Sequence, residues 1–256
     1  MVKNFGFVKL TDFDSATQHA KKEFGRIFEG TDFLQGGNPY YKRVIELLAP
    51  KKDQSLIDLG FGRGFFLREL ENRKMDLYGI DFCESAKNAA TKVLKESKLF
   101  VGDLHQLPFK NNTFDFVTCL GVIEHLVHPD KGVKEIGRIL KKDGTAILTI
   151  PNSIFASINI KKQMILFFIG RILNLLGLRK KPAVHVRQPI DRFYTPSEGK
   201  KLLEENGLQV LYAELVRSKR EDFGVYDKFL DGKIRLSIHF IDANFTLYVC
   251  KHKLET

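Results

Sequence analysis

Apolar and polar positions along the chain change period repeatedly from residue 54 onward. Short apolar runs predict strands over residues 54–59, 76–81, 98–103, 114–120 and 144–150. Helical spacing of apolar positions covers residues 65–73, 84–96 and 133–140 between these runs. Strands that alternate with helices of this length predict right-handed βαβ units, and therefore a parallel sheet.

The flanking segments add helices and two further strands. Residues 1–50 read as polar and helical, and they end in an apolar-periodic stretch, Tyr40 to Leu48, before Pro50. The run Thr195-Pro-Ser-Glu198 predicts a capped helix start, with the helix running to Asn206 and stopping at Gly207. Segments 208–215 and 244–250 predict the last two strands, as an antiparallel pair at one edge of the sheet.

A glycine-rich loop, Asp58-Leu-Gly-Phe-Gly-Arg-Gly64, lies between the first predicted strand and the following helix. Its glycines permit a tight turn and a close approach of a ligand to the main chain. A dinucleotide fingerprint would have its third glycine one residue later, and a Walker A loop would continue with Gly-Lys-Ser/Thr. The Asp58 carboxylate would repel a pyrophosphate, whereas it suits a ligand that carries an ammonium group.

Two more carboxylates follow predicted strand ends. Asp81 ends the second strand, twenty-one residues beyond Gly60, where it can accept both hydroxyl protons of a ribose. Asp103 ends the third strand and is placed to accept a hydrogen bond from an adenine amine, with Leu104 packing on the ring. Each aspartate alone fits ordinary strand-end solvation. Three of them at successive strand ends favour a ligand site, because open α/β sheets bind ligands there.

These motifs together resemble the class I methyltransferases that depend on S-adenosyl-L-methionine (SAM). The matching segments are 56–64, 79–82, 102–109, 114–125 and 139–145, so the resemblance covers residues 40–152 well and residues 193–198 and 202–207 more weakly. It implies a doubly wound, Rossmann-like α/β sheet of seven strands in the order 3-2-1-4-5-7-6, with the last strand antiparallel. It also implies that Asp58 and the glycines hold the methionine moiety, Asp81 the ribose and Asp103 the adenine. The expected cofactor-binding residues are Asp58, Gly60, Phe61, Gly62, Gly64, Asp81, Phe82, Asp103, Leu104 and Leu120.

The end of the fourth predicted strand narrows the type of methyltransferase. The Asn/Asp-Pro-Pro-Tyr/Phe motif of DNA amino-methyltransferases is absent there, and Cys119 lacks the preceding proline of cytosine-C5 enzymes, so we expect this cysteine in the core. Val122-Ile-Glu-His125 resembles small-molecule O-methyltransferases, including the ubiquinone-pathway type. It also resembles the plant small-RNA 2′-O-methyltransferase, whose likeness implies a metal held by two glutamates and two histidines. Gly121 stands where the first glutamate would be, so we expect no metal.

Two histidines are the candidates for catalysis. His185 precedes the helix start at Thr195, in a segment that borders the acceptor pocket in related small-molecule enzymes, and it is the first candidate for a general base. His125 is expected to line the SAM pocket. A surface or core-edge position is the alternative for His185.

An apolar and basic insertion, residues 153–190, separates the fifth predicted strand from the next helix. No Asp or Glu occurs from Gly144 to Ile190, and the whole chain has a net charge of +10. Three roles stay open: a lid on the core or on a second copy of the chain, contact of residues 153–181 with an anionic membrane, or a wall of a pocket for a long apolar substrate. Residues 1–40 are expected to add a helical cover to the methyltransferase domain, residues 41–256.

The sequence therefore predicts a SAM-dependent methyltransferase that acts on a small molecule, at oxygen, with an apolar or lipid-linked acceptor. The alternatives are a 2′-O RNA methyltransferase, weakened by the absence of a recognisable RNA-binding module, and a non-catalytic SAM-binding partner subunit. The three cysteines lack a metal or redox spacing, and the longest apolar stretch, residues 164–169, is too short to span a bilayer. These features favour a cytoplasmic protein with reduced thiols, and a homodimer is left open.

Overall fold

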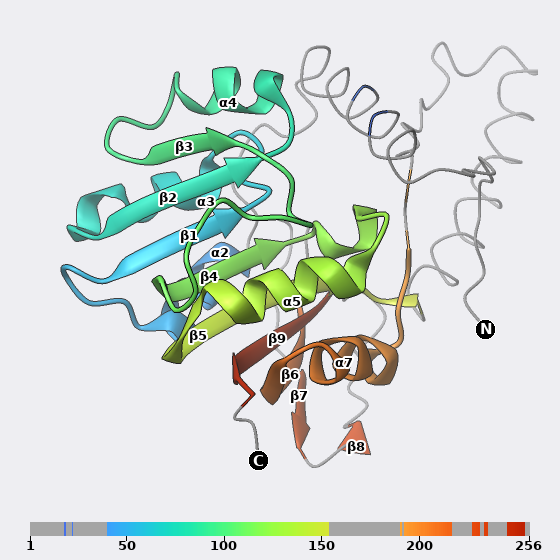
Figure 1. Cartoon of the computed structure of the whole chain (residues 1–256). Helices are drawn as coiled ribbons and strands as arrows, with labels where there is room; N and C mark the ends of the chain where they lie inside the picture. Colours follow the sequence, from blue (N-terminus) through green and yellow to red (C-terminus); the bar gives the residue numbers. More distant parts are fainter. Residues whose placement is uncertain are drawn as a thin grey trace, which may run out of the picture.

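The computed structural model describes residues 40–153, 190, 192–216, 227–230, 233–234 and 245–253, together with residues 18 and 22. These residues form one mixed sheet with helices on both faces (Figure 1). The insertion and the N-terminal cover predicted from the sequence lie almost wholly outside the described residues, and so does His185.

The sheet has the strand order β3-β2-β1-β4-β5-β9-β6-β7-β8. Strands β1 to β5 run parallel to one another, and β9 is antiparallel to both β5 and β6. The first seven strands of this order confirm the predicted topology, with β9 as the antiparallel last strand. Two short strands, β7 and β8, extend the sheet beyond β6. The strands are β1 Ser55–Leu59, β2 Asp76–Asp81, β3 Lys98–Val101, β4 Phe114–Leu120, β5 Leu140–Pro151, β6 Leu208–Val216, β7 Asp227–Leu230, β8 Lys233–Ile234 and β9 Phe245–His252.

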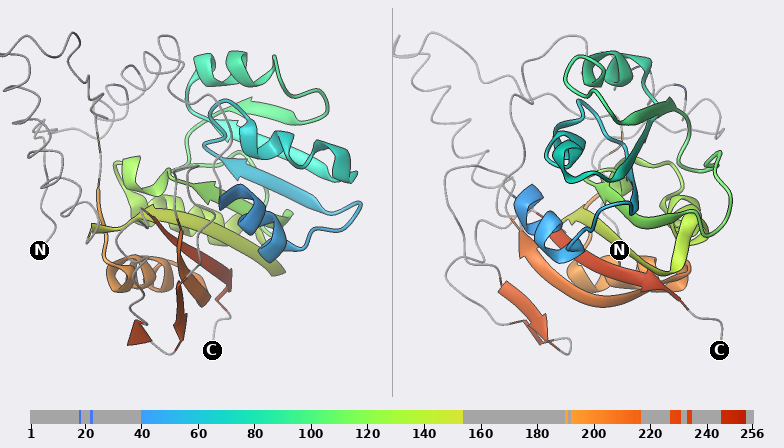
Figure 2. Two further views of the ribbon diagram at one scale, coloured as in Figure 1. Left: turned by 180° about the vertical axis from the view of Figure 1, so that it is seen from behind. Right: turned by 90° about the vertical axis from the view of Figure 1, so that its left-hand side faces the viewer.

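Two apolar cores lie on the two faces of the sheet, because successive strand residues point to opposite sides. In β1, Leu56 belongs to the core under α2, α3 and α4, whereas Ile57 belongs to the core under α5 and α7. Figure 1 shows α5 and α7 in front of the sheet, and Figure 2 shows α2 and α3 on the opposite face. The helices are α2 Tyr40–Leu48, α3 Phe65–Arg68, α4 Glu84–Ala90, α5 Pro129–Ile139 and α7 Pro196–Glu205, with 3-10 turns η1 Glu71–Arg73 and η2 Ile123–His125.

Several predicted helix and strand boundaries were wrong, among them the end of α4. This helix ends at Ala90 and not at residue 96. The Glu71 carboxylate accepts hydrogen bonds from the backbone N–H groups of residues 95, 96 and 97, at 2.8 to 3.3 Å. Those amides are therefore satisfied by a side chain from another element. The helix predicted over 65–73 is likewise split into α3 and η1.

The segment around Leu140 also departs from its predicted structure. Helix α5 begins at Pro129, four residues before the predicted start, since proline suits the first helical turn. Leu140 was expected to end this helix, but it begins β5 and pairs with Phe114 of β4. The third strand ends at Val101, so Asp103 lies two residues past it.

The C-terminal helix follows its predicted cap. The Thr195 hydroxyl accepts the Glu198 N–H at 3.2 Å, and the Glu198 carboxylate accepts the Thr195 N–H at 2.8 Å, which completes a capping box. The helix ends at Glu205, and Gly207 has a φ of +95°. Cys83, Cys119 and Cys250 are buried free thiols, which confirms the core position expected for Cys119. Among the described residues, no helix is long and apolar enough to cross a membrane.

Candidate active site at the carboxyl ends of the parallel strands

The glycine loop turns sharply after β1. Gly60, Gly62 and Gly64 all have left-handed φ values, of +74°, +55° and +75°, which residues with a Cβ rarely adopt. The Gly60 N–H donates to the Ile80 carbonyl at 2.7 Å, so the loop is tied to the end of β2. At Gly60, the side chain of Val122 lies 2.4 Å from where a Cβ would stand. Both the turn and the close packing therefore require glycine there.

Asp58 is a buried carboxylate at the foot of this loop. Its side chain accepts a hydrogen bond from the Thr118 hydroxyl of β4 at 2.7 Å, and only 3% of the residue is exposed. Burial raises the pKa of Asp58 from its ordinary value near 3.8 to about 7. The hydrogen bond from Thr118 opposes this rise, and the nearby Asp81 charge adds to it. The ionised form is thus costly, and a cation placed beside it would stabilise it.

Asp81 closes β2 on the other side of the loop. Its two carboxylate oxygens accept the N–H groups of Gly62 and Cys83, each at 3.0 Å. Burial raises the pKa of Asp81 to about 6, although hydrogen bonds from these amides and from Phe82 oppose it. The glycine loop and the end of β2 are consequently fixed to one carboxylate.

Asp103 is the most exposed of the three carboxylates, with 41% of its side chain accessible. Its Oδ1 accepts the His105 N–H at 2.9 Å and lies 2.5 Å from His105 Nδ1. His105 is itself nearly buried, and its Nε2 accepts the His128 N–H at 3.2 Å. The structure therefore brings together all three predicted carboxylates at neighbouring strand ends.

The apolar residues expected at the cofactor occupy two kinds of position. Phe61 and Leu104 are buried, in the cores on opposite faces of the sheet. Phe82 and Leu120 are partly buried and pack against the same core as Phe61. Because Phe61 packs into the core, its backbone rather than its ring belongs to the loop surface.

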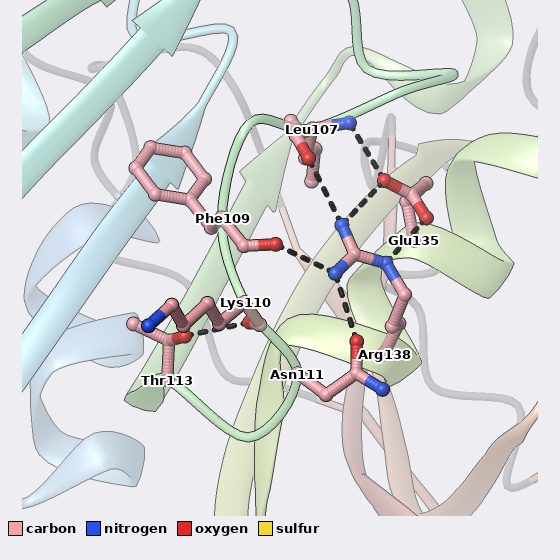
Figure 3. Close-up of polar contacts among 7 residues, drawn as sticks. All are labelled: Leu107, Phe109, Lys110, Asn111, Thr113, Glu135 and Arg138. Atoms are coloured by element: carbon pink, nitrogen blue, oxygen red, sulfur yellow. Dashed lines mark hydrogen bonds and ion pairs between the residues drawn. The ribbon is translucent and has the colours of Figure 1, made fainter.

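The loop from Asp103 to β4 is held by a clamp from α5 (Figure 3). The Arg138 guanidinium donates to the carbonyls of Leu107 and Phe109, at 3.0 and 2.6 Å, and to the Asn111 side chain at 3.0 Å. The Glu135 carboxylate accepts the Leu107 N–H at 2.6 Å and also binds Arg138. This clamp was missed in the sequence, since both residues read as ordinary polar positions of a surface helix.

Glu124 and His125 follow β4 in η2. Glu124 is only 1% exposed, and its Oε1 lies 3.8 Å from His125 Nε2. His125 Nδ1 lies 2.6 Å from the Ile190 carbonyl, so the ring binds the last residue of the insertion. Burial lowers the pKa of His125 to about 4, assisted by the nearby Arg192 charge and opposed by the Ile190 bond. His125 is therefore neutral at physiological pH.

Two further residues at this end of the sheet escaped the sequence analysis. Tyr40, read as a core position of α2, is 2% exposed, and burial, with the charges of Tyr41, Glu124 and Asp58, raises its pKa well above the ordinary value. Arg192 donates through its guanidinium to the carbonyls of residues 126 and 127. The segment that leaves the insertion is thus pinned to the loop after β4. No local signal marks either residue, because both contacts join distant parts of the chain.

Comparisons with known proteins agree with this geometry. Residues 57–148 match a family model described as a methyltransferase domain. Demethylmenaquinone methyltransferase from Thermotoga maritima is 25% identical over 77% of this chain and 91% of its own length. Ubiquinone biosynthesis O-methyltransferase from Coxiella burnetii is 25% identical over 68% of this chain and 71% of its own length.

A solved structure has a similar fold. It is a Haloferax volcanii methyltransferase in complex with the Trm112 methyltransferase activator, at 18% identity. It superposes with a TM-score of 0.63, over 95% of this chain and 98% of its own. At this identity the likeness concerns the fold alone.

Proposed function

We propose that the chain, a SAM-dependent methyltransferase, transfers a methyl group to a hydroxyl oxygen of an apolar aromatic small molecule. The enzyme class and the cofactor, S-adenosyl-L-methionine, rest on the methyltransferase domain over residues 57–148 and on relatives named as methyltransferases. The acceptor, the oxygen and the roles of individual residues are the proposal.

The convergence of Asp58, Asp81 and Asp103 around a left-handed glycine loop carries the assignment of the cofactor site. Asp58 is a buried carboxylate beside which the described part of the chain places no cation, so it fits the ammonium group of the methionine moiety. Asp81 would accept the ribose hydroxyls, and Asp103 the adenine amine. The left-handed glycines of the loop would let this ligand approach the main chain closely. The residues present therefore fit SAM, which when bound supplies an electrophilic methyl group on a sulfonium.

The acceptor pocket is proposed beside Gly121, at the end of β4. At the position of a Cβ on this glycine, the nearest atoms are Glu124 Oε1 at 3.6 Å and a ring carbon of Phe245 at 3.7 Å. The rings of Tyr40 and Phe245 lie 6.0 Å apart, so aromatic surface and a buried carboxylate meet here. An aromatic ring that carries a hydroxyl group matches both features.

His125 is proposed to take the proton that the acceptor hydroxyl must lose. Because its Nδ1 faces the Ile190 carbonyl, we assign the proton to Nδ1, which makes Nε2 the accepting nitrogen. A pKa near 4 keeps Nε2 unprotonated at neutral pH but makes it a weak base, so the proposal requires that the imidazolium be stabilised as it forms. The Glu124 carboxylate, 3.8 Å from Nε2, would stabilise the imidazolium that forms. His185, the first candidate from the sequence, lies outside the described residues and stays a candidate for this role.

The names of the relatives suggest which acceptors to test. Two relatives are named for demethylmenaquinone and for ubiquinone biosynthesis, and such quinones carry a long apolar tail. An apolar insertion between β5 and α7 suits such a tail. Contact of residues 153–181 with an anionic membrane and formation of a homodimer remain predictions of the sequence.

The test supplies the protein with methyl-labelled SAM and a panel of acceptors. The panel contains a prenylated catechol or hydroquinone, the same ring without its tail, and total tRNA. We expect label in the prenylated product, as a methyl ether by NMR, with less in the tail-free ring. Label in a ring carbon would overturn the assignment to oxygen. Label in tRNA alone would favour an RNA methyltransferase, and binding of SAM without transfer to any acceptor would favour a partner subunit.

The role of His125 has its own control. We expect His125→Ala to lower kcat by about 100-fold or more, while the affinity for S-adenosylhomocysteine stays within about threefold. In the wild type, kcat should fall as the pH drops toward 4, because the ring becomes protonated. A His125→Ala enzyme with wild-type kcat and the same pH profile would exclude His125 as the base.

A further inference from the structure

The carboxylate proposed to recognise adenine is held by a residue that sequence reasoning passed over. Both recorded bonds from His105 to Asp103, from the backbone N–H and from ring Nδ1, end on the same oxygen, Oδ1. An aspartate with 41% of its side chain exposed would otherwise sample several rotamers. Two bonds from a nearly buried neighbour select one of them. A carboxylate has about four lone-pair sites, so these bonds do not exhaust its capacity for a ligand amine.

We propose that His105 is a positioning residue that sets the base specificity of the cofactor site by fixing Asp103 toward the adenine amine. This inference rests on the proposed function, because it takes Asp103 as the adenine-binding carboxylate. His105 is not a catalytic residue, since it acts through Asp103.

The orientation of the His105 ring is fixed in turn by helix α5. His128, the residue that caps α5 at its start, donates its backbone N–H to His105 Nε2 at 3.2 Å. The ring accepts at Nε2 and therefore carries its proton at Nδ1, where it can donate to Asp103. The two imidazole rings also meet edge to face, with centroids 6.2 Å apart. Tautomer and orientation are thus both determined by the start of one helix.

The other end of α5 holds the remainder of the same loop. Arg138 and Glu135 bind the backbone of Leu107 and Phe109, as Figure 3 shows, and the Arg138 carbonyl accepts the Asn112 N–H at 2.9 Å. The apolar side of α5 is buried in the core. The loop that begins at Asp103 is consequently attached at both ends to one rigid element, and the placement of Asp103 follows from α5.

The chemistry of the base gives a readout that a loss of stability would not produce. The 6-amino group of adenine donates to a carboxylate, whereas hypoxanthine presents a carbonyl at the same place and would face Asp103 with an acceptor. The ratio of the Kd of S-inosylhomocysteine to that of S-adenosylhomocysteine therefore measures how well Asp103 is aimed. A merely structural role for His105 would weaken both ligands equally and leave this ratio unchanged.

The experiment titrates the full chain with both ligands by calorimetry. We expect the wild type to prefer S-adenosylhomocysteine by about tenfold or more. His105→Leu loses the ring donor and keeps the backbone bond to Asp103, so it should lower this ratio several-fold. His105→Asn, whose amide nitrogen replaces the Nδ1 donor, should retain most of the ratio. Thr195→Ala, which removes a cap on α7, is the control and should keep the wild-type ratio.

The outcomes separate this inference from the function on which it rests. A His105→Leu protein with the wild-type ratio would overturn the positioning role and leave the cofactor site intact. A wild type without any preference, together with an Asp103→Ala protein that binds S-adenosylhomocysteine normally, would overturn the adenine assignment itself. If His105→Leu does not fold, His105→Gln serves instead, because its amide reaches the Nε2 position and cannot donate to Asp103. Retention of the ratio in that variant would equally refute the proposal.

Discussion

Replacement of Asp58 by asparagine should make the ligand-free protein more stable and its cofactor site weaker. The Asp58 carboxyl is 3% exposed, and its pKa is raised from near 3.8 to about 7. At pH 8 the wild type must hold this buried group ionised, which corresponds to about 4 kcal/mol relative to the unfolded chain. Relaxation around a buried charge reduces this figure, so we expect about 1–4 kcal/mol. An asparagine of the same shape carries no such cost.

The dependence on pH has a definite sign. Below about pH 4 the carboxyl is protonated in both the folded and the unfolded chain, so it contributes nothing to the pH dependence. Between pH 4 and 7 the folded protein binds more protons than the unfolded chain, and the free energy of unfolding of the wild type falls as pH rises. The advantage of Asp58→Asn should therefore grow across this window and remain constant above pH 7. Asp81 acts in the same direction, but its contribution cancels because both proteins retain it.

Urea denaturation at pH 4.5 and pH 8 measures this difference. Asp115→Asn is the matched control on the neighbouring strand β4. Although partial burial opposes it, hydrogen bonds from Lys141 and Ser55 lower the pKa of Asp115, so this carboxylate stabilises the fold above its unfolded pKa. The control should therefore lose stability at pH 8, where Asp58→Asn gains it. Parallel stability curves for Asp58→Asn and the wild type from pH 4.5 to 8 would show that ionisation of Asp58 does not destabilise the fold.

Asp58→Asn should also bind S-adenosylhomocysteine more weakly, by about 10- to 100-fold at pH 8, because a charged hydrogen bond to the ammonium group is lost. Wild-type affinity should rise between pH 6 and 8 as Asp58 ionises, whereas the affinity of Asp58→Asn should stay flat over this range. A wild-type affinity independent of pH would contradict the pairing of Asp58 with the ammonium group.

Three further variants test the packing that supports the site. Gly60→Ala should lower the free energy of unfolding by about 3 kcal/mol or more and abolish cofactor binding, since its Cβ would clash and its φ is +74°. Gly207→Ala, at φ +95° with open space around it, should lower it by only about 1 kcal/mol in chemical denaturation. Thr195→Ala should cost about 1 kcal/mol in thermal unfolding without changing the affinity for S-adenosylhomocysteine, because it removes only a helix cap. Arg43→Met should lower the free energy of unfolding by about 3–5 kcal/mol, since it leaves the fully buried Glu214 carboxylate without the guanidinium 2.9 Å away. A loss below about 1 kcal/mol at pH 8 would show that this pair does not hold α2 to β6.

The parallel sheet and the three carboxylates could be predicted because both depend on local patterns, whereas the strand order was expected from the resemblance to class I methyltransferases. Strand period, helix period and short connections determine a βαβ topology, and the carboxyl ends of parallel strands meet at one edge. Asp58, Asp81 and Asp103 therefore fall together without knowledge of any distant contact. The capping box at Thr195 is equally local, since its partners are three residues apart.

The features that the sequence did not reveal depend on contacts between distant segments. Glu71 holds the segment after α4 by binding amides 24 to 26 residues away. His125 read as a pocket residue, but its partner is a carbonyl 65 residues later. The role proposed for His105 depends on its bonds to Asp103 and to the start of α5, which only the folded structure shows. Periodicity carries no information on such pairs, because each depends on how the whole sheet is assembled.

Calorimetric titration of the wild type and of Asp81→Ala with S-adenosylhomocysteine would show whether the carboxylates at the ends of β1, β2 and β3 hold the cofactor. NADH serves as the control ligand. We predict micromolar binding of S-adenosylhomocysteine and none of NADH by the wild type, and binding weakened by about 1–3 kcal/mol in a folded Asp81→Ala protein, whose ribose hydroxyls lose their acceptor. Unchanged affinity in Asp81→Ala, or binding of NADH in place of S-adenosylhomocysteine, would contradict the account.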